Sequence, residues 1–422
     1  MSEDVDQARR QGKAGLSRLT TATAVTSLVL VALSYVTNAM DRQVFPVVLP
    51  QVSKDLGFSL AQGGLLATIF TLGIGIAGVP TGFLLDRLSR KTVILLGIGV
   101  YSAFTVLTGF GVAFFDMFAY RALSGVGEAM QNAALFSAVG AYFFAHRALA
   151  IGTLNFAYGV GGFLGPLLGA NLAVSFGSWR VPFYVFGAVG FLFVVIVGMF
   201  VTRQFTEQVE LASPQESERG VIDEVPSHFF NRNVLLLGLT AAVVGVAMYG
   251  FIGLYPTFLQ KQLHFSLGDA GTVASLFGLG AMMGLPAGYL IDRLNVRYVL
   301  IVALLVGALV GFLIFNGPES IGWQYALAFA EGAIASGFCF VGVYSGLQRA
   351  VRPGLVGRAS GFYVTCFYIP ASVAGYVFSS LVGATGWGGA GFWQLTVIPL
   401  VGVVALLFVN TNQLTRVATA RP

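Results

Sequence analysis

The chain has 422 residues, of which 56% are hydrophobic and only 10% are charged. Soluble proteins carry about 25% charged residues. This composition, with a mean hydropathy of +0.81, therefore excludes a soluble protein and indicates a polytopic membrane protein. The net charge of +5 comes from loop residues and does not indicate nucleic-acid binding.

The N-terminal segment is polar and basic, and no small-residue cleavage site follows the first apolar run. This pattern predicts a cytoplasmic N-terminal tail over residues 1–21 rather than a cleaved signal peptide. The two cysteines, Cys339 and Cys366, lie in apolar runs and indicate no disulfide framework.

Twelve apolar segments follow, each long enough to cross a membrane as a helix. We expect an N-terminal six-helix bundle over 22–201, a polar cytoplasmic linker over 202–232, a C-terminal six-helix bundle over 233–411 and a cytoplasmic tail over 412–422. The predicted spans are 22–50, 59–84, 92–111, 115–142, 149–174, 181–201, 233–260, 268–291, 297–316, 321–348, 357–383 and 389–410.

The basic residues fix the expected orientation of these spans. With both termini placed in the cytoplasm, 18 of the 23 basic residues fall on the cytoplasmic side. Only Lys54, Arg180 and Lys261 fall outside. This asymmetry follows the positive-inside rule, so we expect both termini in the cytoplasm.

The sequence also contains an internal repeat. The segment GVPTGFLLDRL at 78–88 matches GLPAGYLIDRL at 284–294, at an offset of 206 residues, and Pro50 and Pro256 share that offset. FSLAQGG at 58 returns as FSLGDAG at 265. The expected fold is thus an all-α membrane protein with twelve transmembrane helices in two pseudo-symmetric six-helix bundles. Such duplications place a substrate site between the halves, near the bilayer midplane.

A known family has similar motifs. GFLLDRLSRK at 82–91 resembles the signature of the major facilitator superfamily, G-x-x-x-D-R-x-x-R-K between spans two and three, and GSWRVPF at 177–183 resembles its loop between spans five and six. The second copy of the signature has no second basic residue after Arg297. The resemblance implies alternating access. It also implies a gating motif, in which a carboxylate at a helix end latches the halves in one state, comprising Gly82, Asp86, Arg87, Arg90, Lys91, Asp292 and Arg293. The alternative is that these charges only set topology.

Five ionisable residues lie inside the predicted spans, where each charge costs at least ~2.5 kcal/mol on insertion scales. They are Asp41, Arg42, Arg121, Glu128 and Glu331. The first two have no counterpart in the second half, since the offset of 206 leads to Ala247 and Met248. A requirement of the fold should appear in both halves, so we interpret the pair as functional. The alternative is a buried ion pair that fixes helix packing.

The acidic and basic groups of span four share one face. Arg121 and Glu128 are seven residues apart, which returns to nearly the same side of a helix. The resemblance implies that spans one, four, seven and ten line the cavity, with Asp41 and Glu128 as proton-coupling sites. The predicted substrate-binding residues are Arg42, Arg121, Tyr35, Asn155, Tyr158, Tyr249, Glu331 and Tyr363. The alternative for Glu331 is that it is a lone protonated acid, which the fold tolerates and which has no function.

Two branches of the superfamily share the charged pattern of NAMDRQVF (38–45) and RALSGVGEA (121–129). GVGEA resembles the Spinster-like branch of lysolipid and sphingolipid carriers, and YGFIGLYPTFLQ (249–260) resembles the anion–cation symporter branch. The expected function is proton-coupled secondary transport of a small organic anion. The alternatives are a Spinster-like lipid carrier or a proton-driven exporter of an amphiphile. The exporter alternative rests on the glycines and proline at 161–169, for which close packing with a kink is the structural reading.

An enzyme is not expected, because the three histidines lie in loops without metal-ligand spacing and no nucleophile motif is present. We expect no cofactor and no bound metal. The expected partners are the small-molecule substrate, protons and membrane lipids, with no nucleic acid, and the protein is expected to be a monomer. The expected location is a bacterial inner membrane.

Overall fold

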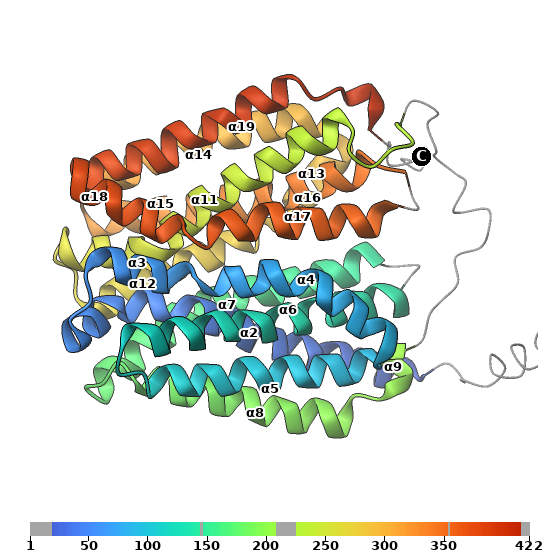
Figure 1. Ribbon diagram of the computed structural model, residues 1–422, viewed down its shortest axis with the longest axis horizontal. Coiled ribbons are helices and arrows are strands. Elements are labelled where there is room, and N and C mark those ends of the chain that lie inside the picture. The colour runs from blue at the N-terminus through green and yellow to red at the C-terminus, as the bar shows by residue number, and fades with distance from the viewer. Residues whose placement is uncertain (1–18, 144–146, 208–224, 353–354, 415–422) are drawn as a thin grey trace, which may run out of the picture.

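The computed structural model describes residues 19–143, 147–207, 225–352 and 355–414; the side chains of Asp86 and of residues 147–151 are not described. The described residues are helical and contain no strand. Figure 1 shows two stacked bundles of roughly parallel helices, which we call the N-terminal and C-terminal halves.

The N-terminal half consists of α2 (Thr21–Leu56), α3 (Leu60–Thr68), α4 (Phe70–Arg87), α5 (Arg90–Gly109), α6 (Phe114–Tyr142), α7 (Arg147–Ser175), α8 (Val181–Phe200) and the short α9 (Arg203–Glu207). The C-terminal half consists of α11 (Arg232–Lys261), α12 (Leu267–Ala281), α13 (Gly284–Arg293), α14 (Val296–Asn316), α15 (Ile321–Glu331), the π-helix η2 (Gly332–Phe340), α16 (Val341–Arg349), α17 (Val356–Ala371), α18 (Ala374–Gly391), the π-helix η4 (Phe392–Val397), α19 (Ile398–Leu407) and the 3₁₀ turn η5 (Thr411–Gln413).

Ten helical stretches among the described residues are long and apolar enough to cross a membrane. One of them, Val356–Leu407, has 52 residues, and Gly386 interrupts it with a φ of 74°. At ~1.5 Å per residue this stretch is long enough for two spans of a ~30 Å hydrocarbon core. The helix α6 has 29 residues but does not count among the ten, because its polar residues lower its hydropathy. Counting Val356–Leu407 as two spans and adding α6 to the other nine stretches gives the twelve predicted spans.

The repeated FSL sequence forms an N-terminal helix cap in each half. The Ser59 hydroxyl accepts a hydrogen bond from the Gln62 backbone at 3.2 Å, and the Ser266 hydroxyl accepts one from the Asp269 backbone at 3.0 Å. Each serine therefore starts the helix that opens the second span of its half. The internal repeat of the sequence is thus also a repeat of local structure.

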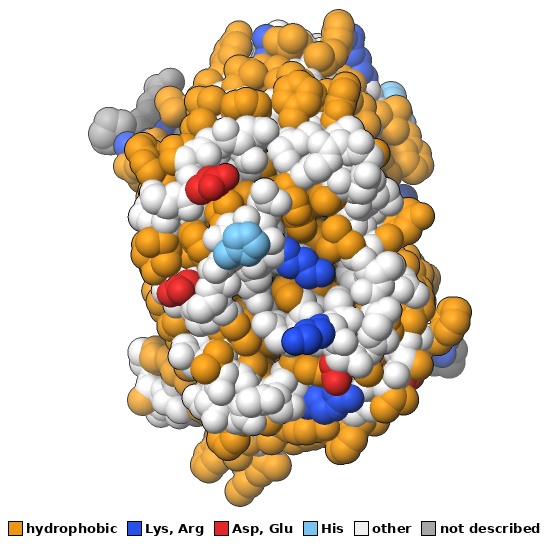
Figure 2. Space-filling model, turned by 90° about the vertical axis from the view of Figure 1, so that its left-hand side faces the viewer, with side chains coloured by type: hydrophobic (Ala, Val, Ile, Leu, Met, Phe, Trp, Pro, Cys, Tyr) orange, Lys and Arg blue, Asp and Glu red, His pale blue; other side chains and the backbone are white. Residues whose placement is uncertain are grey.

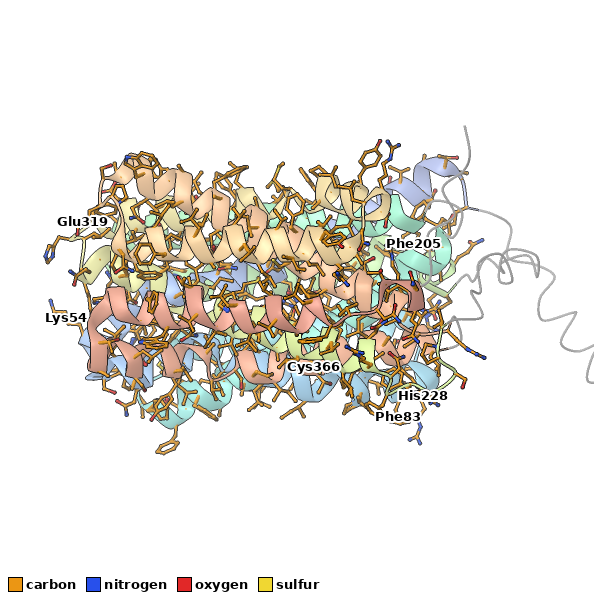
Figure 3. All side chains as sticks on the ribbon, turned by 90° about the horizontal axis from the view of Figure 1, so that it is seen from above. Lys54, Phe83, Phe205, His228, Glu319 and Cys366 are labelled. Atoms are coloured by element: carbon orange, nitrogen blue, oxygen red, sulfur yellow. The ribbon has the colours of Figure 1, made fainter. Side chains whose placement is uncertain are left out.

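The two ends of the molecule differ in what they carry. Lys54 and Glu319 lie at one end, and Phe83, Phe205 and His228 lie at the other (Figure 3), where the described part of the chain begins and ends (Figure 1). We call these the far end and the terminal end. Figure 2 shows the far end, where a few Lys, Arg, Asp and Glu side chains are scattered among polar and hydrophobic ones.

The halves contact each other toward the far end. Gln51 donates to Gln260 at 2.8 Å and Thr68 donates to the Ser372 carbonyl at 2.8 Å. Glycine also lets the backbones approach closely, since a Cβ at Gly64 would overlap the backbone of Gly375. Toward the terminal end, by contrast, Cβ atoms on Gly82 of α4 or on Gly357 and Gly361 of α17 would meet nothing within 4 Å. At these glycines the halves are therefore packed closely at the far end and open between α4 and α17 at the terminal end, whereas α7 and α13 remain in contact, since a Cβ at Gly152 would lie 2.5 Å from the Leu285 side chain.

The glycines of α7 pack against α2. A Cβ at Gly161 would overlap the Val36 carbonyl, one at Gly165 would lie 2.8 Å from the Met40 carbonyl, and one at Gly169 would lie 2.7 Å from the Val44 side chain. Small residues at this interface permit close helix approach. Close packing therefore accounts for these glycines without an export function.

Candidate functional site

A ladder of polar contacts joins α2 to α6 inside the N-terminal half. Gln131 donates to the Ser34 hydroxyl at 3.0 Å and accepts a hydrogen bond from Asn38 at 2.8 Å. Ser34, Asn38 and Arg42 are spaced by four residues, so they share one face of α2. All of these side chains are buried. The ladder fixes the rotation of α2 against α6 and brings the charged residues of both helices together.

Arg42 forms an ion pair with Glu128. The Arg42 Nε and Glu128 Oε2 atoms are 2.7 Å apart, with side-chain exposures of 2% and 0%. The N–H bond is not directed at the oxygen, so the contact is an ion pair without good hydrogen-bond geometry. Ser124 donates to the other Glu128 oxygen at 3.3 Å. The structure thus pairs Arg42 with Glu128 rather than with its neighbour in sequence.

Asp41 and Arg121 complete the charged cluster. Both carboxylate oxygens of Asp41 are buried without a hydrogen-bond partner among the described residues. Arg121 and Arg42 both lie near enough to Asp41 to offset its charge. The Arg121 guanidinium also lies 4.7 Å from the ring centre of Phe45 and 5.0 Å from that of Phe70. Two guanidinium and two carboxyl groups therefore share one buried site.

Aromatic side chains from both halves surround the charged cluster. The Arg42 guanidinium lies 5.8 Å from the ring centre of Tyr158, and the Tyr35 ring is 6.1 Å from that of Tyr158. From the C-terminal half, the Tyr249 ring lies 5.8 Å from that of Phe70, which covers Arg121, and 6.0 Å from that of Tyr368. The charged cluster thus lies beside the boundary between the halves.

The other three predicted substrate residues, Asn155, Tyr363 and Glu331, are not part of this cluster. Asn155 lies half-buried on α7. Tyr363 donates to the Phe340 carbonyl at 3.1 Å and stacks on Phe367, inside the C-terminal half. Glu331 borders a cavity whose lining residues all belong to the C-terminal half. Of the predicted set, Asp41, Arg42, Arg121, Glu128, Tyr35, Tyr158 and Tyr249 come together.

The predicted gating residues make contacts within their own halves. Asp292 pairs with Arg349 of α16 at 2.5 Å, and Arg293 lies 4.1 Å from the ring centre of Tyr289. Arg90 donates to the Thr206 carbonyl at 3.2 Å, and the Lys91 ammonium donates to the Gly198 carbonyl at 2.8 Å. Gly82 and Arg87 are exposed. The side chain of Asp86 lies outside the described residues.

Two residues of the site were not predicted. Phe45 and Phe70 cover Arg121. The four-residue spacing of Ser34, Asn38 and Arg42 is a signal in the sequence for the polar face of α2. The aromatic residues give no such signal, because phenylalanine and tyrosine are common throughout membrane helices.

The family model of the Major Facilitator Superfamily matches residues 31–375, which is more than half of the chain. The chain belongs to the Major Facilitator Superfamily. A hexuronate transporter of Bacillus subtilis (strain 168) is 26% identical over 260 residues, covering 61% of this chain and 61% of that protein. Protein spinster of Drosophila melanogaster is 28% identical over 316 residues, covering 69% of this chain and 51% of that protein.

The matches span less than two thirds of the length of these two relatives. The fold matches a crystal structure of a bacterial homologue of the human lysosomal transporter Spinster, in an inward-facing and unoccupied conformation, over 94% of this chain and 97% of that chain. The TM-score is 0.69 at 21% identity. The predicted superfamily and fold are confirmed, and the chain is an integral membrane protein of that superfamily.

Proposed function

We propose that this superfamily member is a proton-coupled secondary transporter of a small organic anion. The observation that carries the proposal is the buried ion pair of Arg42 and Glu128 at the boundary between the halves. Arg121 and Asp41 lie beside it, so the cluster contains as many acids as guanidinium groups. A single proton added to this cluster leaves one positive charge in excess.

Proton and anion binding would then support each other. A proton on Glu128 ends its ion pair with Arg42 and frees the guanidinium to bind a substrate carboxylate, which it can do through two parallel hydrogen bonds. An anion on Arg42 in turn favours the protonated form of Glu128. Because this coupling is reciprocal, proton and anion would cross together as the halves rock about the closed site.

The substrate class is inferred from the charge of the site and from the relatives. The hexuronate transporter named above acts on sugar acids by its name, and such a substrate offers one carboxylate for a guanidinium. Its hydroxyl groups would suit the phenol groups of Tyr35, Tyr158, Tyr249 and Tyr368. We therefore favour a sugar acid or a similar hydrophilic anion over a lipid.

The same proposal includes the orientation and setting of the protein. Most of the 23 basic residues lie in the segments expected on the cytoplasmic side, so we assign the terminal end and both chain termini to the cytoplasm. The proposed setting is a bacterial inner membrane, with the protein acting as a monomer. Protonation and alternating access together make the transport secondary active.

The proposal is tested in proteoliposomes with radiolabelled glucuronate as the first substrate and glucose as the uncharged control. Asp41→Asn and Glu128→Gln should each abolish accumulation driven by an imposed pH gradient. At least one of them should retain counterflow, because exchange does not need a proton cycle. Asp269→Asn, which changes an exposed carboxylate at the far end, is the matched control. Accumulation by both neutral variants under a pH gradient alone would exclude the two carboxyls as coupling sites.

A Spinster-like lipid carrier is the second candidate, favoured by the fold match to the Spinster homologue. A thermal-shift screen of purified protein distinguishes the two, because a ligand that binds only the folded state stabilises it by about 2.7 kcal/mol at 100 times its Kd. Stabilisation by lysophospholipid and not by sugar acids would favour the lipid carrier. An exporter of an amphiphile would be identified by the same screen followed by efflux measurements.

A further inference from the structure

Glu331 occupies an unusual environment inside the C-terminal half. Its side chain is 5% exposed, and its Oε2 atom has no hydrogen-bond partner among the described residues. It borders a cavity of about 30 Å³ that is otherwise lined by apolar side chains and the Cys339 thiol. Among the residues that the structure describes, no arginine, lysine or histidine lines this cavity. The carboxyl group is thus buried without a cation to balance it.

The cavity corresponds by internal symmetry to the site of Asp41. The offset of 206 relates Asp41 to Ala247 and Tyr101 to Gly307, and both Ala247 and Gly307 line the cavity. Tyr101 is buried and interacts with Asp41. Glycine at the equivalent position has no side chain to fill this space. The cavity therefore exists where the N-terminal half has a tyrosine beside its acid.

The register of α6 and α15 supports the same correspondence. A Cβ at Gly73 would meet the Ala122 carbonyl, and one at Gly280 would meet the Phe329 carbonyl, so these crossings are related by 207 residues. At this offset Glu128 corresponds to Ala335, which also lines the cavity, and Ser124 corresponds to Glu331. Each half thus buries a carboxyl group at equivalent places, from different helices.

Two π-helices meet at this cavity. Glu331 is the last residue of α15, directly before η2, which contributes Ile334 and Ala335 to the lining. The second π-helix, η4, contributes Leu395. Segments of π-helix are rare and occur frequently at functional sites. Their convergence at a buried acid is an observation independent of the cavity itself.

The surroundings restrict what the cavity can hold. An isolated ionised carboxylate in an apolar environment is very unfavourable, so the neutral acid is the stable form. A hard cation such as Ca²⁺ takes six or more oxygen ligands, and one carboxyl group among apolar side chains does not supply them. The volume is sufficient for one or two water molecules, and the Glu331 carboxyl and the Cys339 thiol are the polar side-chain groups among the described lining residues that such a water would contact. Proton and water are the ligands that fit.

The neighbouring titratable groups do not offer Glu331 a positive charge. Tyr255 on α11 interacts with it, but its hydroxyl donates to Gln324 at 2.9 Å. Cys339 on η2 also interacts with it. No lining residue contributed by α14, η4 or α19 is titratable, and no residue of α12 lines the cavity. Protonation is therefore the available way to neutralise Glu331.

We propose that Glu331 is a proton-binding site of the C-terminal half, holding a proton together with one or two water molecules, separate from the Arg42–Glu128 pair. It lies in the cavity that the internal repeat relates to the surroundings of Asp41, although the repeat position of Asp41 itself is Ala247. The described residues that line this cavity include neither Arg42 nor Arg121, so we assign it protons and not the anion.

Infrared difference spectroscopy of the purified protein at neutral pH tests the site without any transport. The spectrum of the unchanged protein minus that of Glu331→Gln should contain the carbonyl band of a protonated carboxyl, and this band should shift in D₂O. Glu331→Asp should move the band without removing it. The control Asp269→Asn should leave it unchanged, since that carboxylate is exposed.

The outcomes separate this inference from the transport proposal. Loss of a carboxylate band instead of a protonated one would overturn the proton site, and a protonated band that does not shift in D₂O would overturn the water-containing cavity. Glu331→Gln mimics the neutral acid and should change the Tm at neutral pH by no more than about 1 °C. A larger fall would indicate an ionised, paired Glu331. None of these results depends on which substrate is carried.

Discussion

The pairing of Arg42 with Glu128 can be tested through stability with a double-mutant cycle. Glu128→Gln leaves Arg42 buried beside Arg121 and Asp41, so the cluster has one positive charge in excess. Arg42→Gln leaves one negative charge in excess. The double variant has one charge of each sign and is balanced again. We therefore expect each single variant to be less stable than the double variant.

The size of the effect follows from the burial of the pair, with exposures of 2% and 0%. Removing one partner of such a pair costs about 3–5 kcal/mol. An unfolding entropy of ~2.1 cal/mol/K per residue gives about 0.9 kcal/mol/K for this chain, so each single variant should lower the Tm by about 3–6 °C. The double variant should recover a coupling energy of about 2–3 kcal/mol.

The assay is thermal unfolding in detergent, followed by the fluorescence of the four tryptophans. Asp55→Asn is the control, because Asp55 pairs with Arg180 at 3.3 Å at the surface, with exposures of 51% and 28%. An exposed pair of this kind contributes about 0–1 kcal/mol. If the effects of the two single variants add in the double variant to within about 0.5 kcal/mol, Arg42 and Glu128 do not act as a pair.

Two further predictions concern how the halves move. Gly278→Ala should slow uptake several-fold at normal expression, because its Cβ would overlap the backbone of Gly162 in the other half; Gly99→Ala, where a Cβ meets nothing within 4 Å, should not. Unchanged uptake by Gly278→Ala would show that this contact adapts freely. Asp292→Asn should lower stability by no more than about 1 kcal/mol, since Asp292 is half-exposed in its pair with Arg349, but should slow transport if the motif is a latch. An unchanged transport rate in proteoliposomes would reduce Asp292 to a topology charge.

The sequence was sufficient to predict the architecture because the repeat and the hydropathy are local signals. The repeated DRL segments and the FSL caps mark the same helices in both halves, and the caps appear in the structure at Ser59 and Ser266. The breaks between α3 and α4 and between α12 and α13 were not predicted. The first break lies in a continuous apolar run without a nearby proline, whereas the second is followed by Pro286 in the first turn of α13, which cannot donate to the Met282 carbonyl and was a signal in the sequence that we did not use.

The partners of the charged residues could not be derived from spacing alone. Arg42 was interpreted as a functional pair with Asp41, its neighbour in sequence, whereas its ion-pair partner in the structure is Glu128. The choice depends on the rotation of α2 against α6, which the contacts of Gln131 with Ser34 and Asn38 determine. Such a rotation is a tertiary property. A helical wheel shows which residues share a face, and not what that face contacts.

The asymmetry between the halves bears on how coupling is divided. In the N-terminal half, two guanidinium groups balance Asp41 and Glu128, so a proton there changes the charge available to an anion. In the C-terminal half, no guanidinium among the described residues lines the cavity of Glu331. A proton there changes only the charge of the carboxyl group and hence the free energy of burying it. Binding of a proton therefore has different consequences at the two carboxyl sites. Protonation in the N-terminal half would change the binding of the substrate. Protonation in the C-terminal half would change the packing of η2 and η4 around Glu331.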